Sequence, residues 1–184
     1  MRNVEFKAEL RDLSLARAIV GRLGGSWAET IRQRDTYFRV PSGRLKRREI
    51  EGEATEWIEY DRPEGPGSRI SEYTIRSEEE ALAWYGEMEI PTWAVVVKVR
   101  EVYLLGNVRI HLDRVEGLGD FIEFEAVLAR GAGEDEERAA RASLKDLRER
   151  LGPVLGEAIA VGYADLVAGN APDATRAARG GGGA

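Results

Sequence analysis

The sequence predicts an α+β protein in which eight short antiparallel strands form a closed β-barrel with helices packed outside it. Two observations lead to this prediction. The chain contains about eight segments in which polar and apolar residues alternate, joined by tight turns and interrupted by a few helical segments. Several of these segments place charged residues on one face and apolar residues on the other, and the helices offer apolar stripes that can cover the apolar faces.

Length and composition restrict the class of protein. The chain has 184 residues, enough for one domain with a sizeable core, which we expect to span residues 1–169. It has no cysteine, so disulfides and thiolate chemistry are excluded. The net charge of −6 argues against a nucleic-acid partner, and neither a secretory signal nor a membrane-spanning apolar run is visible. We therefore expect a cytoplasmic protein without a membrane partner, ending in a disordered Ala- and Gly-rich tail over 170–184.

In the first half of the chain, several strands and one helix are expected. The helix begins after Asp12, a residue type that caps helix N-termini, and ends at Leu23 before two glycines. Alternating polarity marks the strands, and the turn 41–43 (Pro-Ser-Gly) separates two of them. The expected strands cover residues 3–10, 32–40, 44–49, 55–61 and 69–76.

The second half of the chain is expected to hold the remaining strands and further helices. Ser77 followed by Glu80 is a capping-box pattern, which predicts the start of a helix. Two amphipathic helices near the C-terminus are separated at Gly152 and Pro153. The expected elements are a helix over 78–88, a strand over 92–105, two strands within 108–125 joined by a Gly-rich loop, and helices over 134–151 and 153–168.

The segment 108–125 places its charges where a sheet is normally dry. Arg109, His111 and Asp113 share one strand face, and Glu123 and Glu125 share a face of the next strand. The same pattern recurs in other strands. The basic members are Lys7, Arg44, Lys46, Arg48, Arg69, Lys98, Arg100 and Arg109. The acidic members are Glu5, Glu9, Asp113, Glu123 and Glu125.

Charged strand faces of both signs predict a site for a polyanion with metal ions. Each motif alone is more typical of a solvated surface, but the recurrence in several strands makes that reading less satisfactory. If the apolar faces pack on helices, the charged faces must line an interior, where unpaired charges are costly. Arg and Lys neutralise phosphate oxygens, and clustered carboxylates hold Mg²⁺ or Mn²⁺. A metal-bound triphosphate fits both groups of residues.

In addition, these segments resemble the CYTH superfamily of triphosphate tunnel metalloenzymes, and within it the class IV adenylyl cyclase branch. The resemblance runs from about Asn3 to Ala168. It rests on the ordered series NVEFK, DTYFRVPSGRLKRRE, EYDRP, SEY, KVREVYLLGNVRIHLD and EGLGDFIEFE. It implies an eight-stranded tunnel that binds a triphosphate along its axis.

The resemblance also implies roles for individual residues. Glu5, Glu123 and Glu125 would be metal ligands. Asp113 would be either a further ligand or a carboxylate that contacts a ligand without touching the metal. Phosphates would be bound by Lys7, Arg44, Lys46, Arg48, Arg69, Lys98, Arg100 and Arg109. Lys7, Asp113 and a metal-bound hydroxide are candidates for the general base.

The first Glu of the ExExK signature is Asn3 here, so a site using it should hold a divalent cation more weakly. His111, the only histidine, is expected in a supporting role.

Three functions are compatible with the sequence. The first is a class IV adenylyl cyclase that converts ATP to cyclic AMP and pyrophosphate. The second is a triphosphatase that hydrolyses inorganic tripolyphosphate, thiamine triphosphate or a nucleoside triphosphate in the same tunnel. The third is a non-catalytic module that binds polyphosphate or nucleotide, and Asn3 is its only support. An exposed barrel or helix face can support a homodimer, although nothing in the sequence identifies one.

Overall fold

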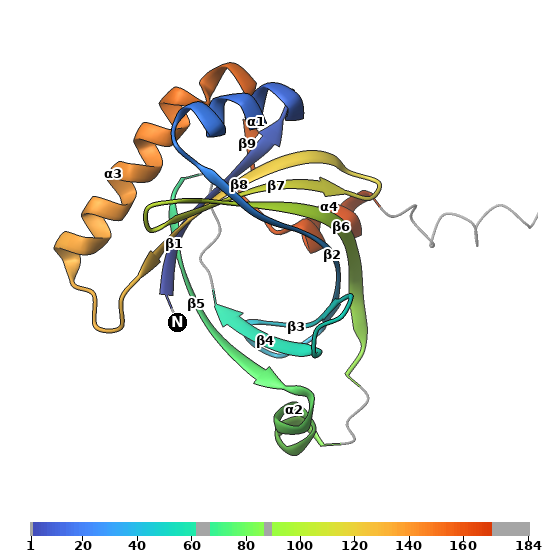
Figure 1. The fold of residues 1–184 in the computed structure, drawn as a ribbon. Coiled ribbons are helices and arrows are strands. Elements are labelled where there is room, and N and C mark those ends of the chain that lie inside the picture. The colour runs from blue at the N-terminus through green and yellow to red at the C-terminus, as the bar shows by residue number, and fades with distance from the viewer. Residues whose placement is uncertain (1, 62–66, 87–89, 171–184) are drawn as a thin grey trace, which may run out of the picture.

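The computed structural model describes residues 2–61, 67–86 and 90–170. Within these ranges, strands mostly follow one another in runs that helices interrupt, as the sequence predicts (Figure 1). The elements are β1 (Arg2–Leu10), α1 (Leu13–Arg22), β2 (Ser26–Phe38), β3 (Arg44–Ile50), β4 (Glu56–Asp61), β5 (Arg69–Ser77), α2 (Glu78–Tyr85), β6 (Thr92–Leu105), β7 (Val108–Val115), β8 (Gly119–Leu128), α3 (Glu134–Arg150), a 3₁₀ turn (Gly152–Val154), β9 (Leu155–Ala158) and α4 (Tyr163–Asn170).

Eight antiparallel strands form a closed barrel, which confirms the predicted fold class. The strand order is β5-β4-β3-β2-β6-β7-β8-β1, and pairing between β1 and β5 closes the ring (Figure 1). The short strand β9 lies outside the barrel and pairs with the far end of β1. All these strand pairs are antiparallel, so tight turns suffice for most of the connections.

The main hydrophobic core lies outside the barrel, between its wall and two helices. Val4 and Phe6 of β1 and Phe124 of β8 point away from the barrel interior, and Phe6 and Phe124 stack with ring centroids 5.8 Å apart. Leu144 of α3 and Val20 of α1 pack in the same cluster. In Figure 1 both helices lie on the β1–β7–β8 side of the barrel. The apolar strand faces are therefore covered by helices, which leaves the charged faces pointing inward.

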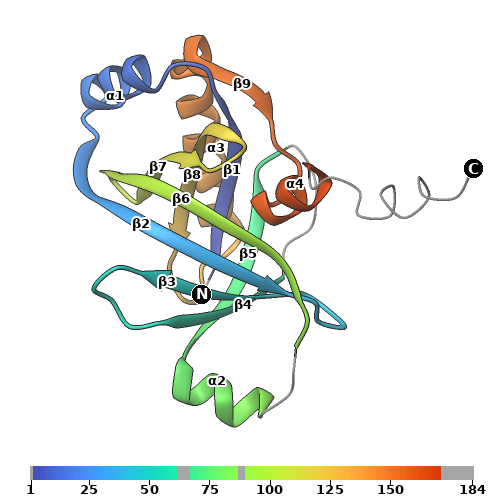
Figure 2. The ribbon, with the colours of Figure 1, turned by 90° about the vertical axis from the view of Figure 1, so that its right-hand side faces the viewer.

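A second core lies at one end of the barrel, where α4 packs. Tyr163 and Ala164 of α4 contact the cluster that includes Ala94 and Val96 of β6 and Phe121 of β8. The rings of Phe121 and Tyr163 meet edge to face with centroids 5.0 Å apart. This end of the barrel is thereby covered by α4 (Figure 2).

The N-termini of α1 and α2 have the capping residues that the sequence predicts. The Asp12 side chain accepts a hydrogen bond from the Leu15 backbone N–H at 2.9 Å, and α1 follows directly. Ser77 and Glu80 form the predicted reciprocal capping box at the start of α2. None of the described helices is long and apolar enough to cross a membrane.

Two element predictions were wrong. The helix expected over 153–168 is instead a 3₁₀ turn, β9 and α4, because residues 155–158 pair with the edge of β1. A Cβ at Gly156 would lie 2.8 Å from the Cβ of Glu9, so glycine permits this close approach. Likewise, β2 begins at Ser26 rather than at residue 32, because its first residues pair with β6 as far as Leu104. In both segments, partners distant in the chain decided the structure.

Two predictions reach beyond the described residues. The end of the helix expected over 78–88 falls partly in the undescribed stretch 87–89, and α2 ends at Tyr85. The tail expected to be disordered over 170–184 lies outside the described residues from 171 onward, and Asn170 is the last residue of α4.

Candidate active site

The barrel encloses a cavity of about 410 Å³, here called the barrel cavity, whose wall is rich in charged side chains. The predicted site residues that line it are Glu5, Lys7, Lys46, Arg48, Lys98, Arg100, Arg109, Glu123 and Glu125. These side chains come from β1, β3, β6, β7 and β8, so the alternation within each strand brings them together across the barrel. The expectation that the charged faces look inward is therefore confirmed for these nine residues.

One wall of the cavity is acidic because strand register aligns three strands. Glu123 of β8 lies opposite Lys7 of β1 on one side and His111 of β7 on the other. Glu125 lies opposite Glu5 and Arg109 in the same way. We call Glu5, His111, Glu123 and Glu125 the acidic wall. Facing positions in neighbouring strands bring side chains within contact distance, so these residues form one cluster.

Glu123 is held as a buried anion by cations from two strands. Its carboxylate lies 3.2 Å from Lys7 Nζ and accepts a hydrogen bond from Arg100 Nη2 at 2.7 Å. Burial alone would raise the pKa of Glu123, but Lys7 and the other neighbouring cations outweigh burial and hold it well below its usual range. Glu123 is therefore ionised at neutral pH, as a metal ligand must be.

Asp113 is fully buried behind the cavity wall. Arg100 donates two hydrogen bonds of 2.6 Å to its carboxylate, Lys98 donates one of 3.2 Å, and the Tyr163 hydroxyl donates one of 2.9 Å. Burial would raise the pKa of Asp113, but Arg100 and Lys98 lower it far below its usual range. The contacts thus place Asp113 against the two cations of β6, outside the set of side chains that line the cavity.

The opposite wall of the cavity contains an acidic residue that sequence reasoning missed. Asp35 of β2 accepts hydrogen bonds from Gln33 Nε2 at 2.8 Å, Lys46 Nζ at 2.8 Å and Arg48 Nε at 3.0 Å. Although burial opposes ionisation, Lys46 and Arg48 hold the pKa of Asp35 far below its usual range. Alternation in the sequence does place residues 33, 35 and 37 on one face, which is the signal that marks Asp35 as an inward-facing carboxylate.

Two predicted phosphate-binding residues make other contacts. Arg44 Nη1 donates to Asp165 Oδ2 of α4 at 2.9 Å, and its guanidinium lies 5.5 Å from the centroid of Trp93. Arg69 donates a hydrogen bond to the Ala160 carbonyl, and its Nη2 lies 3.9 Å from Glu5 Oε1. Neither belongs to the described cavity lining. Glu9, the remaining acidic residue considered, is exposed at the surface.

Along β6 the lining changes from apolar to basic and back to apolar. Val96 packs on the α4 side, Lys98 and Arg100 follow in the middle, and Val102 and Leu104 line the far end with Ile31 of β2. Leu104 is 45% exposed, so this end of the cavity opens to solvent. The cavity thus has a covered end, a basic middle and a mouth where apolar side chains lie beside Glu29 and Arg109.

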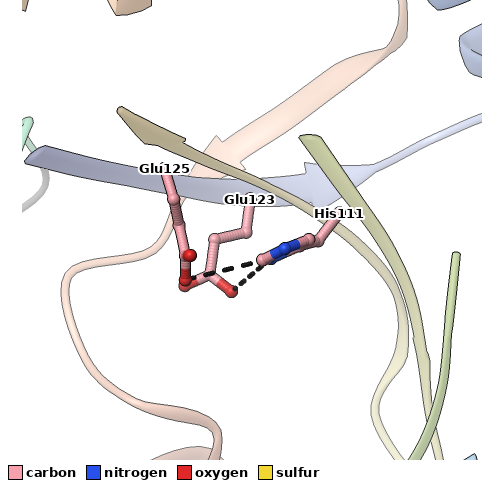
Figure 3. Close-up of side chains that lie close together, drawn as sticks. All are labelled: His111, Glu123 and Glu125. Atoms are coloured by element: carbon pink, nitrogen blue, oxygen red, sulfur yellow. Dashed lines mark ion pairs between the residues drawn. The ribbon is translucent and has the colours of Figure 1, made fainter. Parts of the chain in front are cut away.

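The acidic wall has the donor atoms that a divalent cation needs. His111, Glu123 and Glu125 each offer a ligand atom, and these atoms lie within 4.8 Å of one another (Figure 3). Asn3 Oδ1 and His111 Nδ1 are buried and have no hydrogen-bond partner among the residues that the structure describes. Carboxylate oxygens suit Mg²⁺ and Mn²⁺, so the residues present fit the predicted metal.

Comparison with solved structures supports the same fold. A protein of Pyrococcus horikoshii OT3 has a TM-score of 0.71 at 23% identity, covering 90% of this chain and 99% of that chain. A Vibrio parahaemolyticus protein described as a candidate adenylate cyclase has a TM-score of 0.69 at 20% identity, covering 89% and 96%. A candidate adenylyl cyclase from Hippeastrum, described as having a dominant triphosphatase activity, has a TM-score of 0.56 at 14% identity, covering 87% and 91%.

Sequence comparison identifies the family. No curated protein matches the chain with significant similarity. The family model for the CYTH domain, however, matches residues 1–153, which include the whole eight-stranded barrel and every residue of the acidic wall. The chain therefore belongs to the CYTH domain family.

Proposed function

We propose that this protein is a metal-dependent enzyme that binds ATP in the barrel cavity and converts it to cyclic AMP and pyrophosphate. One observation carries the proposal: a carboxylate wall and a row of cations face the same barrel cavity. CYTH proteins act on triphosphates, and a triphosphate with its metal matches both groups of side chains. The apolar side chains at the mouth support a nucleoside triphosphate over an inorganic one, because Ile31, Val102 and Leu104 offer a surface for a base, with Glu29 beside them as a polar contact.

Each set of residues then has a distinct task. Lys46, Arg48, Lys98 and Arg100 hold phosphate oxygens in the middle of the cavity, where low dielectric strengthens each contact. Glu5, Glu123 and Glu125 hold the cation, which when bound polarises the phosphates and lowers the pKa of the attacking hydroxyl.

In the reaction, the ribose 3′-hydroxyl would release its proton to solvent, its oxygen would bond to the α-phosphorus, and the bond from that phosphorus to pyrophosphate would break. Lys7 lies beside the acidic wall, 3.2 Å from Glu123, and is the candidate for contact with the reacting phosphate. Asp113 acts indirectly, through the Arg100 and Lys98 side chains that it orients.

Product analysis tests this function. Protein without an affinity tag is incubated with ATP and, separately, with tripolyphosphate, each with Mg²⁺ and with Mn²⁺. Cyclic AMP and pyrophosphate in equal amounts are expected from ATP. Orthophosphate from either substrate without cyclic AMP would instead establish the triphosphatase, which the described activity of the Hippeastrum relative favours as the second candidate. Binding without turnover under either metal would establish a non-catalytic module.

The binding of a triphosphate is expected to depend on pH. Burial, assisted by Arg100, lowers the pKa of Lys98 to about 7, and burial, assisted by Arg48, lowers that of Lys46 to about 8. Each lysine loses its positive charge as pH rises through its pKa. Affinity for tripolyphosphate without metal should therefore fall as pH rises through about 7 and then about 8.

Calorimetric titration at several pH values, on the wild type and on Lys98→Arg, measures this effect. Arginine keeps its charge at all these pH values, so the variant should lose the step near 7 and keep the one near 8. Because tripolyphosphate also titrates, only the difference between the two proteins is diagnostic. Identical pH profiles would show that Lys98 does not bind the phosphates in its charged form.

A further inference from the structure

His111 is the one histidine of the chain, and its imidazole faces the carboxylates of the acidic wall (Figure 3). We propose that Nδ1 of His111 coordinates the divalent cation directly, beside carboxylate oxygens of Glu123 and Glu125. This nitrogen ligand biases the site toward cations that accept imidazole, such as Mn²⁺ and Co²⁺, over Mg²⁺. The inference rests on the proposed function only in requiring that the cavity hold a cation.

The first argument is the separation of the ligand atoms. His111 Nδ1 lies 3.6 Å from Glu123 Oε2 and 3.9 Å from Glu125 Oε1. Hydrogen bonds between nitrogen and oxygen are shorter, about 2.7–3.2 Å. Two ligands bound to one cation at about 2.1 Å each, however, lie about 3.0–4.2 Å apart, depending on the angle between them. The observed separations suit a shared ion better than a direct contact.

The second argument is the state of the imidazole. His111 is only 4% exposed, and its Nδ1 has no hydrogen-bond partner among the described residues. A buried polar atom without a partner is costly and calls for a ligand that the side chain can bind. Asn3 Oδ1, also buried in the lining of the same cavity, is unpartnered within the described part of the chain as well. Gln33 Oε1 is a third such atom of the lining, so an orphaned atom alone does not mark a cation; His111 Nδ1 does, because two carboxylate oxygens lie 3.6 and 3.9 Å from it.

The third argument is that the imidazole is already held in position. His111 lies in the middle of β7, directly opposite Val102 of β6 and Glu123 of β8. Hydrogen-bonded neighbours on both sides leave its strand little freedom to shift, so the ring is pre-organised beside the carboxylates. Imidazole suits first-row transition metals, whereas Mg²⁺ prefers oxygen ligands and retains its waters. The predicted metal preference follows from this one nitrogen.

Because the chain has one histidine, pulsed EPR on the Mn²⁺-loaded protein tests the contact directly. Tag-free protein is loaded with Mn²⁺ alone. The expected spectrum shows the modulation of a coordinated ¹⁴N imidazole nucleus, replaced by the ¹⁵N pattern after labelling with ¹⁵N-histidine and lost in His111→Asp. Bound Mn²⁺ without nitrogen coupling would overturn the inference but leave the proposed function intact. A failure to bind Mn²⁺ would count against both.

Metal selectivity provides a second readout. Calorimetry should give a tighter Kd for Mn²⁺ than for Mg²⁺ in the wild type, and His111→Asp should lower that ratio at least ~10-fold by supplying oxygen in place of nitrogen. Glu116→Gln, a change on the exposed β7–β8 turn, is the control and should leave the ratio unchanged. If His111→Asp leaves the ratio unchanged in a folded protein, the nitrogen is not a ligand.

Discussion

The Glu123→Gln variant is expected to lose metal-dependent turnover, by at least ~100-fold in kcat at saturating metal. The substitution keeps the shape of the side chain and removes its charge. Glu123 is buried between Lys7 and Arg100 and faces His111 across the strand pair, so its charge serves both the cation and the basic row. A neutral amide binds a divalent cation weakly and leaves two buried cations less well compensated.

Steady-state kinetics with the product assay described above measures this loss. Glu116→Gln makes the same chemical change on an exposed turn and should retain wild-type kcat. Urea unfolding of both variants separates loss of function from loss of fold. A Glu123→Gln protein that is folded and turns over at the wild-type rate would remove Glu123 from the site.

For Asp113→Asn, the main expected effect is on stability, with a fall of ~3–5 kcal/mol in the free energy of unfolding. Asp113 is fully buried and accepts hydrogen bonds from Arg100, Lys98 and Tyr163. Its charge compensates two buried cations, and it ties α4 to β7 through Tyr163. Removing one partner of a buried ionic network leaves the others uncompensated, which costs more than the net contribution of the pair.

The exposed pair between Asp120 and Arg114 provides the matched control. Their atoms lie 3.3 Å apart, with side chains 29% and 65% exposed, so Asp120→Asn should cost only ~0–1 kcal/mol. Denaturant unfolding measures both variants. Calorimetry on folded Asp113→Asn should show unchanged Mn²⁺ affinity, because Asp113 lies behind the wall. Lost affinity with unchanged stability would support the ligand role that the sequence suggested for Asp113.

For several strands, the side chains that face the interior could be predicted from the sequence. Glu5 and Lys7 in β1, Lys46 and Arg48 in β3, and Lys98 and Arg100 in β6 were assigned to one face each and line the cavity. Alternation is a local property of an extended backbone, so the face of a residue follows from its position in the strand. Helix caps at Asp12 and Ser77 were predictable for the same reason, since a cap depends on residues within one turn.

The contacts between inward-facing side chains could not be predicted from the sequence. Glu123 and Asp113 carry the same charge and face the same interior, yet Glu123 lines the cavity while Asp113 lies behind Arg100 and Lys98. The role of Asp35 could not be predicted because it depends on contacts with Lys46 and Arg48 of the neighbouring strand. Whether an inward-facing residue lines the cavity depends on its position along the barrel axis. The alternation of polar and apolar residues in a strand does not specify that position.

The barrel with a charged interior could be predicted from the chain alone, because the two-residue repeat of a strand and the apolar stripes of the helices are local features. The neighbours of each inward-facing side chain, in contrast, depend on how the strands pair. Register between strands placed His111 opposite Glu123, and pairing with β1 turned residues 155–158 from an expected helix into β9. Register and edge pairing are set by hydrogen bonds between segments distant in the chain, which no local pattern specifies.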